Sequence, residues 1–363
     1  MSASHLPAAE RATLVVPCHN EEGYVDVLLA GLVAQFAADP DAAAGWSVVL
    51  VDDHSTDGTA AIVDAAAADH FFVTAVHGHY GSPGGARSAG AAVALSAHAQ
   101  PEWLVTVDAD VELMPGWMAA WNANFALVRA DETVGAVNGV ELQDHLFASF
   151  PNAAAVSAAF GGVIGVSEGA LGVTNLNGVN HAVRTTAYLT AGPYLQPTAP
   201  GPEGPLVLAG EDWDLGVRIR RAGFRIIDTE SAVRDRGRRL LADVYAYVSG
   251  EAYEGAFTRL QPHAPSTDVP AADVDMLRES AVERSLRHFF FKPLLAGAVP
   301  LDAAGLSADT VAAMQDWIAR WPHPTFEESR NGFIFGRLER FSAAFTQSAC
   351  TDLGITLTPH TPH

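Results

Sequence analysis

The most constraining feature of the sequence is a series of short apolar runs, each followed by a polar cluster and then by a helical pattern. The runs lie at residues 12–17, 46–51, 71–76 and 103–107, and the helical patterns at 22–36, 60–68, 86–97 and 115–128. This alternation predicts a largely parallel sheet with helices on both faces. Such sheets bind ligands beyond the carboxyl ends of their strands, so the polar clusters are the candidate functional residues.

The pattern changes in the second half of the chain. Further strands are predicted at 134–142, 177–183 and 224–227, a loop rich in proline and glycine at 193–205, and a short helix at 212–222. Residues 145–173 have no clear period. From about residue 240 the pattern is helical, at 240–257, 274–295, 308–319 and 326–345. We therefore expect an α/β domain at residues 1–235 and a mainly helical extension at 236–363.

The charge balance limits the classes of partner. The 363-residue chain has 42 Asp and Glu against 21 Lys and Arg, a formal net charge of −21. This excess of negative charge argues against a protein whose main role is to bind nucleic acid or anionic lipid. Lys292 is the only lysine. A site for an anionic small molecule must therefore use arginine, backbone N–H groups or a metal ion.

The sequence predicts a cytoplasmic protein without an integral membrane segment. Its N-terminus, MSASHLPAAERA, lacks a signal peptide, and no run reaches about 18 uninterrupted apolar residues. Cys18 and Cys350 are expected to be reduced thiols. The run Phe289–Phe291 beside Lys292 allows a peripheral contact with the inner face of a membrane, but the sequence favours a buried helix there.

Two of the polar clusters follow the first and second apolar runs. They read PCHNEE at residues 17–22 and VDDHSTDG at 51–58. Adjacent carboxylates at the end of a buried strand, as at Asp52 and Asp53, are costly unless they accept hydrogen bonds. Donors on a nucleotide base or ribose would meet that need. The alternative is that one of the two carboxylates caps the following helix.

The next two clusters suggest sites for phosphate and metal. In GSPGGARSAG, at residues 81–90, exposed backbone and Arg87 stand near a helix N-terminus, which suits a phosphate or a polar base edge. Asp108 and Asp110, separated by one alanine, follow the fourth apolar run directly. Two carboxylates so placed can hold Mg²⁺ or Mn²⁺, which in turn contacts diphosphate oxygens.

A fifth cluster suggests a catalytic base. Glu211 and Asp212 begin the helix predicted at 212–222, where an acidic residue is often only a cap that interacts with the helix dipole. Beside a site for metal and diphosphate, the pair also suits a general base for an acceptor hydroxyl. Trp213 either stacks on an acceptor ring or packs beneath the helix. Asn180 and His181 lie in a predicted strand and are candidates for contact with the donor sugar or acceptor.

Together these clusters resemble the family 2 glycosyltransferases with the GT-A fold. The matching stretches are VVPCHNEE, VDDHSTDGT, GGARSAG, DAD and GEDWDLGVRIRRAGFRI, which span about residues 10–235. The resemblance implies a GT-A nucleotide-diphospho-sugar transferase fold, Mn²⁺ or Mg²⁺ as cofactor, and transfer with inversion to an acceptor hydroxyl. A UDP-sugar is the default donor, and the acceptor is unknown.

The resemblance also implies roles for individual residues. It places Pro17 and Asp53 at the nucleotide base, Arg87 near the base or diphosphate, Asp108 at ribose or metal, Asp110 as the principal metal ligand, and Asp212, beside Glu211, as the catalytic base. Inversion by direct displacement needs one well-placed carboxylate, while the metal offsets charge on the leaving diphosphate.

The sequence departs from the family pattern at two places. Many relatives have a histidine after the Glu-Asp helix, whereas this chain has an arginine-rich stretch at 234–239. Arg238 and Arg239 there are candidates for a diphosphate or anionic acceptor site, or else a solvated turn. Processive synthases carry Gln-x-x-Arg-Trp, but Trp317 stands where the glutamine would be. The enzyme is therefore expected to be non-processive.

Two other classes of protein are built on a similar sheet and are alternatives to a glycosyltransferase. A sugar-nucleotidyltransferase would need a glycine-rich, cationic loop directly after the first strand, and VVPCHNEEG lacks it. A catalytically silent nucleotide-sugar-binding protein would be expected to have lost Asp110 or Asp212, and both are present. Turnover of a nucleotide-sugar is the observation that separates an enzyme from a silent binding protein.

Overall fold

The computed structural model describes residues 11–97, 99–195, 198–199, 206–207, 210–250, 267–295, 299–300, 305–320 and 348–355. The chain divides into two compact units. The first comprises residues 1–143, 176–195 and 211–236, and the second comprises 144–175, 196–210 and 237–363. The two units are thus interleaved along the chain, and the assignment of catalysis to residues 1–235 stays a prediction.

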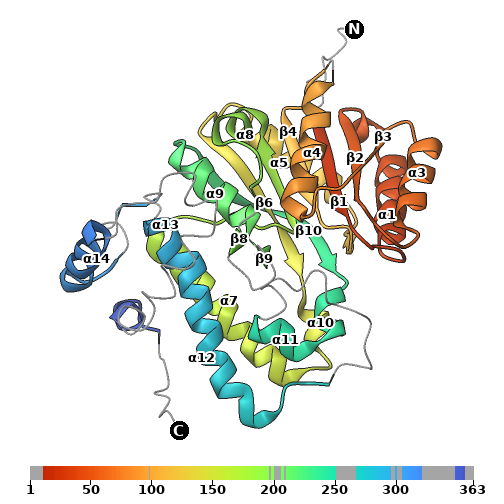
Figure 1. The fold of residues 1–363 in the computed structure, drawn as a ribbon. Coiled ribbons are helices and arrows are strands. Elements are labelled where there is room, and N and C mark those ends of the chain that lie inside the picture. Colours follow the sequence, from red (N-terminus) through yellow and green to blue (C-terminus); the bar gives the residue numbers. More distant parts are fainter. Residues whose placement is uncertain are drawn as a thin grey trace. The chain divides into compact units, whose positions relative to one another are not determined.

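The first unit is built on an eight-stranded sheet in the order β3-β2-β1-β4-β7-β6-β10-β5 (Figure 1). The strands are β1 (Ala12–Cys18), β2 (Trp46–Asp53), β3 (Val73–Gly78), β4 (Trp103–Val107), β5 (Val111–Leu113), β6 (Val134–Leu142), β7 (Asn180–Arg184) and β10 (Arg225–Asp235). β2 is parallel to β1 and β3, β4 is parallel to β1, and β10 is parallel to β6. β7 runs antiparallel to β4 and β6, and β5 runs antiparallel to β10. The sheet is therefore mixed.

Alternating residues of the strands reach two different cores. Leu14 and Val16 of β1 are buried with residues of α1 (Val25–Ala38), α3 (Thr59–Asp69) and α5 (Trp117–Val128). Val15, between them, is buried on the opposite face with Ala86 of α4 (Pro83–Ser96). Helices α8 (Thr185–Ala191) and α9 (Glu211–Arg221) share a further core with β6, β7 and α4. Helices on both faces of an α/β sheet confirm the predicted fold class.

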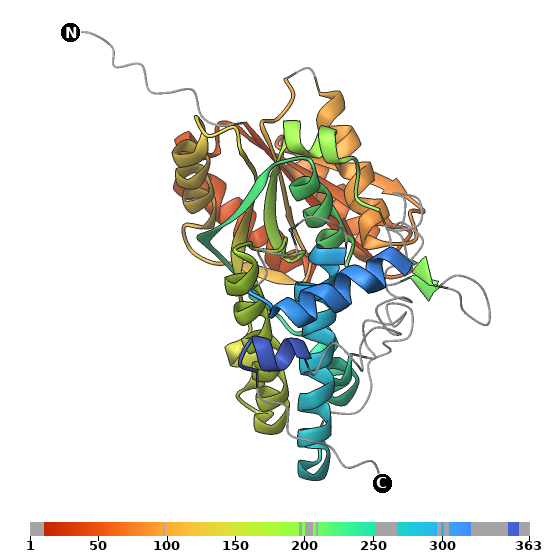
Figure 2. The same ribbon diagram turned by 90° about the vertical axis from the view of Figure 1, so that its left-hand side faces the viewer.

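The second unit is mainly helical. Its described elements are α6 (Asp144–Phe147), α7 (Pro151–Leu171), β8 (Thr198–Ala199), β9 (Leu206–Val207), α10 (Arg238–Ala242), α11 (Val244–Ser249), η3 (Ala271–Asp273), α12 (Val274–Ser285), η4 (Leu286–Phe291), α13 (Lys292–Leu295) and α14 (Ala308–Arg320). Helices α7 and α12 lie side by side, as Figures 1 and 2 show. Phe289, Phe290 and Phe291 are buried, as the sequence favoured. The helix predicted at 326–345 lies outside the described residues.

Helix α7 is a long element that the sequence did not predict. Its residues are mostly Ala, Gly, Ser and Val, so its buried and exposed positions differ little in hydrophobicity. Val156 and Val163 are nonetheless buried against the other helices of the second unit. By length and composition α7 could cross a membrane, with a mean hydropathy of 1.4, although core helices of soluble proteins pass the same criterion.

Candidate functional site

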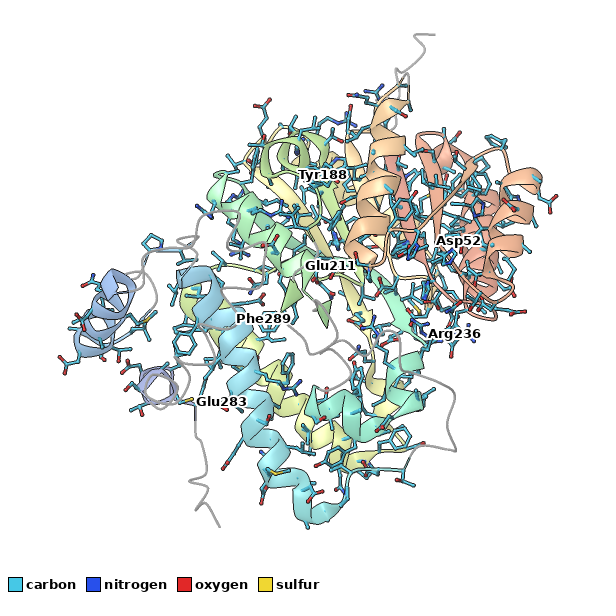
Figure 3. All side chains as sticks on the ribbon, in the orientation of Figure 1. Asp52, Tyr188, Glu211, Arg236, Glu283 and Phe289 are labelled. Atoms are coloured by element: carbon cyan, nitrogen blue, oxygen red, sulfur yellow. The ribbon has the colours of Figure 1, made fainter. Side chains whose placement is uncertain are left out.

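The predicted site residues of the first unit gather where the parallel strands end, which we call the carboxyl edge. β1, β2 and β4 bring Pro17, Asp53 and Asp108 to this edge. β7 runs the other way, so its first residue, Asn180, lies there too and pairs with Val107. Figure 3 labels Asp52, at the end of β2, and Arg236, which directly follows β10. The topology therefore converts separate strand ends into one row of polar groups.

Asp53 organises the loop that leads into α4. Its carboxylate accepts backbone hydrogen bonds from Tyr80 (2.5 Å), Gly81 (3.0 Å) and Ser82 (3.0 Å). The hydroxyl of Ser82 then caps α4 by accepting from the backbone N–H of Gly85 (3.1 Å). These bonds supply the donors that a buried carboxylate needs without any ligand. Contact of Asp53 with a nucleotide base stays a prediction.

Two non-glycine residues at the carboxyl edge have left-handed backbone conformations. They are Asn20 (φ 55°), which lies just beyond the end of β1, and His54 (φ 57°), which directly follows β2. The Asn20 backbone N–H donates to the hydroxyl of Ser55 (3.0 Å), and the ring of His54 stacks on that of His79 with centroids 4.7 Å apart. Such conformations persist only where surrounding contacts enforce them, and they concentrate at functional sites.

Arg87 joins two acidic motifs in the interior of the first unit. Its guanidinium donates to Asp108 Oδ1 (2.5 Å) and to Glu211 Oε1, and also to the carbonyl of Gly178 (3.2 Å). Burial by itself lowers the pKa of Arg87, but the charges of Asp108 and Glu211 raise it above its ordinary value. The predicted contact of Arg87 with a nucleotide would have to compete with these two carboxylates.

The Asp108-Ala109-Asp110 turn connects β4 to β5. The backbone carbonyl of Asp110 accepts a hydrogen bond from the N–H of Arg236 (3.2 Å), which holds the turn against the end of β10. Within the described part of the chain, no three His, Cys, Asp or Glu side chains form a ready group for a metal ion. One or two carboxylates that share a cation with substrate phosphates are nevertheless an ordinary arrangement for Mg²⁺. The predicted ligands, Asp110 with Asp108, fit that arrangement.

Glu211 and Asp212 are both buried at the start of α9. Figure 3 shows Glu211 at the sheet side of this helix. Asp212 faces the Gly178 backbone so closely that a Cβ at position 178 would lie 2.8 Å from Asp212 Oδ2. Trp213 is half-buried. The role of Asp212 as base stays a prediction.

The side chains of Asn180 and His181 make hydrogen bonds to other groups within the protein. Both are fully buried. The Asn180 amide donates to the carbonyl of Ser231 (2.9 Å), and the His181 ring is 2.8 Å from the hydroxyl of Tyr194. Burial and the charge of Arg87 lower the pKa of His181 to about 3, so the ring is neutral at physiological pH. This geometry gives both residues a supporting role, and their contact with substrate stays a prediction.

Sequence reasoning did not single out a second acidic pair at the carboxyl edge. The side-chain amide of Gln143 donates to both Glu141, near the end of β6, and Asp235, at the end of β10. Burial and the charge of Asp235 raise the pKa of Glu141 to about 8. For Glu141 the available signal was its place near the end of the strand predicted at 134–142. Asp235 lies well beyond the strand predicted at 224–227, because β10 continues to Asp235. Arg238 and Arg239, by contrast, belong to α10 of the second unit.

Comparison with known families supports the assignment made from the motifs. Residues 13–125 match the model of glycosyl transferase family 2. The match runs from β1 into α5 and contains the first four polar clusters. It confirms the predicted resemblance, and with the observed sheet it confirms the GT-A fold class and the enzyme class, a glycosyltransferase. No curated protein sequence matches the chain significantly.

Several solved structures are similar in outline. A mannosyltransferase from Pyrobaculum calidifontis, in complex with GDP-Man and Mn²⁺, is 20% identical, with 95% of this chain and 86% of that chain covered and a TM-score of 0.44. S. aureus TarS (residues 1–349) is 15% identical, with 91% and 90% covered and a TM-score of 0.44. Glucosyl-3-phosphoglycerate synthase from Mycobacterium tuberculosis, with Mn²⁺, UDP and phosphoglyceric acid, is 15% identical, with 64% and 73% covered and a TM-score of 0.40. These values indicate only a distant likeness.

Proposed function

We propose that this glycosyltransferase moves a sugar from a nucleoside-diphosphate sugar to an acceptor hydroxyl, with inversion and without processive extension. The observation that carries the proposal is the carboxyl edge, where Asp108, Asp110 and the Glu211–Asp212 pair belong to one folded unit. Arg87 links the two acidic motifs directly through Asp108 and Glu211. A leaving diphosphate and an incoming hydroxyl would both find their chemical partners at this edge.

Asp212 is the proposed general base. The acceptor oxygen attacks the anomeric carbon as its proton passes to the Asp212 carboxylate. The bond from that carbon to the diphosphate oxygen breaks on the opposite side, and the electron pair leaves with the nucleoside diphosphate. Because a single displacement inverts the carbon, no second nucleophilic carboxylate is required. The helix N-terminus favours the ionised form of Asp212 that this step needs.

Asp110, with Asp108, is the proposed binding site for Mn²⁺ or Mg²⁺. A divalent cation supplies positive charge that stabilises the departing diphosphate. Asp110 lies in the turn that the Arg236 backbone N–H holds in place, so its backbone position is set before any ligand arrives. Asp110→Asn is therefore expected to weaken metal-assisted binding of donor and leave the melting temperature nearly unchanged.

A ligand screen tests the donor class. Thermal unfolding would be followed with UDP, GDP and dTDP and with their sugars, each with Mn²⁺ and with EDTA. A nucleotide that binds the native state at 100 times its Kd adds about 2.7 kcal/mol to the free energy of unfolding. We expect a UDP compound with Mn²⁺ to give the largest rise. Equal binding and turnover in EDTA would contradict metal dependence, and binding without turnover across acceptors would favour a silent binding protein.

Paired variants test the proposed base. Asp212→Asn keeps the shape of the side chain but removes its basic oxygen, so kcat should fall by about 10²–10⁴-fold with donor affinity little changed. Glu211→Gln should lose activity only at the lower end of this range, because the Glu211 carboxylate is engaged by Arg87 and positions the base without acting as one. An inactive Glu211→Gln beside an active Asp212→Asn would assign the base to the other member of the pair.

A further inference from the structure

The buried position of Arg87 between two acidic motifs is not explained by nucleotide binding. Only 2% of Arg87 is exposed. Its Nη2 donates to Asp108, which follows β4, and its Nη1 donates to Glu211, which begins α9 and lies 124 residues away in the sequence. Nη2 also donates to the carbonyl of Gly178, just before β7. One side chain thus ties together three segments of the carboxyl edge.

We propose that Arg87 is a positioning residue of the transfer reaction, which holds the Asp108 turn and the Glu211–Asp212 helix in register and does not bind the nucleotide. The inference rests on the proposed function. Both terminal nitrogens of the guanidinium are already engaged by protein oxygens. The Nε–H is buried as well and has no hydrogen-bond partner among the described residues. Because Arg87 is buried and both of its terminal nitrogens are bonded to protein, it offers little access to a phosphate.

The contacts of Arg87 give the two neighbouring acids different environments. Consecutive residues of a helix point about 100° apart, so Glu211 and Asp212 cannot both face Arg87 in the same way. Glu211 is the member whose carboxylate Arg87 holds. Asp212 lies against Gly178, whose carbonyl also accepts from Arg87. Arg87 therefore restrains Asp212 twice, through the start of its helix and through the Gly178 backbone that its carboxylate faces.

The geometry of a guanidinium is what this role requires. Arginine presents several N–H groups in a planar fork and can reach two carboxylates at once, whereas lysine is a single flexible charge. Arg87→Lys keeps the positive charge among the buried carboxylates, which a neutral residue would leave unpaired. It is therefore the variant that removes the two-armed contact with least risk to folding. Arg225→Lys is a matched control, since Arg225 pairs with Asp131 at the exposed surface of the same unit.

The first experiment compares binding with chemistry in the full chain. Titration calorimetry with UDP, and with GDP, in the presence of Mn²⁺ measures nucleotide affinity, and steady-state transfer from the active donor measures kcat. We expect Arg87→Lys to bind nucleotide within about threefold of the wild type but to transfer about 10²-fold more slowly, the scale of a 1 Å misplacement. Arg225→Lys should match the wild type in both. Tenfold weaker nucleotide binding by Arg87→Lys, or an unchanged kcat, would overturn the proposal.

A second experiment needs no substrate. The free energy of unfolding is measured for the wild type, Arg87→Lys, Glu211→Gln and the double variant. The positioning contact predicts a double variant less destabilised than the sum of the single changes, because each change breaks the same bond. Additive losses would overturn the proposal. If the two changes are not additive but the protein binds no nucleoside diphosphate, the contact between Arg87 and Glu211 is supported and the proposed function is refuted. If Arg87→Lys does not fold, Glu211→Gln must show the same loss of kcat at unchanged nucleotide affinity, and failure to do so also overturns the proposal.

Discussion

The substitution Gly178→Ala tests how closely the fold sets the proposed base. A Cβ at position 178 would lie 2.8 Å from Oδ2 and 3.1 Å from Cγ of Asp212. Ordinary van der Waals contact begins at 3.4 Å, so the carboxylate must move by about 0.6 Å. Since a displacement of about 1 Å can cost about 10²-fold in rate, we expect kcat to fall roughly tenfold.

The same substitution should leave the fold and the nucleotide site intact. The φ angle of Gly178 lies outside the left-handed region, so alanine meets no backbone strain there. Alanine also reduces the conformational entropy of the unfolded chain, which offsets part of the cost of the new contact. We therefore expect a melting temperature close to that of the wild type and an unchanged affinity for UDP and Mn²⁺.

Steady-state and single-turnover transfer, with a melting curve for each protein, provide the measurement. Gly31→Ala is the control in the same unit, because its Cβ would meet Leu113 at an ordinary 3.5 Å. It should not change kcat. The reasoning is refuted if Gly178→Ala transfers at the wild-type rate, or if it loses rate only in proportion to nucleotide affinity.

Three further predictions concern stability. Asp53→Ala leaves the backbone N–H groups of the loop before α4 without their acceptor. Chemical denaturation without nucleotide should therefore show that the free energy of unfolding falls by about 1–3 kcal/mol. An unchanged free energy of unfolding would contradict this. Burial by itself lowers the pKa of His77, but hydrogen bonds and charges of Asp64 and Asp52 outweigh it and raise the pKa above 6.5. The stability that protonated His77 contributes is therefore complete below pH 6.5 and is lost as pH rises through the raised pKa. We expect His77→Ala to lower the melting temperature at pH 6 more than at pH 9. Because the pKa of Glu141 is raised in the folded protein, the free energy of unfolding falls as pH rises from about 4.5 to about 8. Glu141→Gln should therefore raise the melting temperature at pH 8 and not at pH 4. Equal effects at the two pH values would exclude the raised pKa as the cause.

The sequence by itself determined the elements of the α/β half. Runs such as WSVVLV and WLVTV are too apolar to be exposed, and the helical patterns between them leave a strand-helix alternation as the natural solution. The polar clusters mark strand ends because a buried run must stop where charged residues begin. That local logic was enough to predict a carboxyl edge, and the resemblance of the polar clusters to a known family predicted the family whose model matches residues 13–125.

Tertiary structure alone decided which polar groups meet. The partner of Arg87 on α9 is 124 residues away, and its capture of Glu211 depends on where α9 packs. The carboxylate of Asp53 is bound by backbone N–H groups 27–29 residues further along, which no residue type at those positions announces. The antiparallel course of β7 and β5 likewise follows from long-range pairing. Local sequence encodes propensity and burial, but contacts between distant segments depend on how the whole sheet assembles.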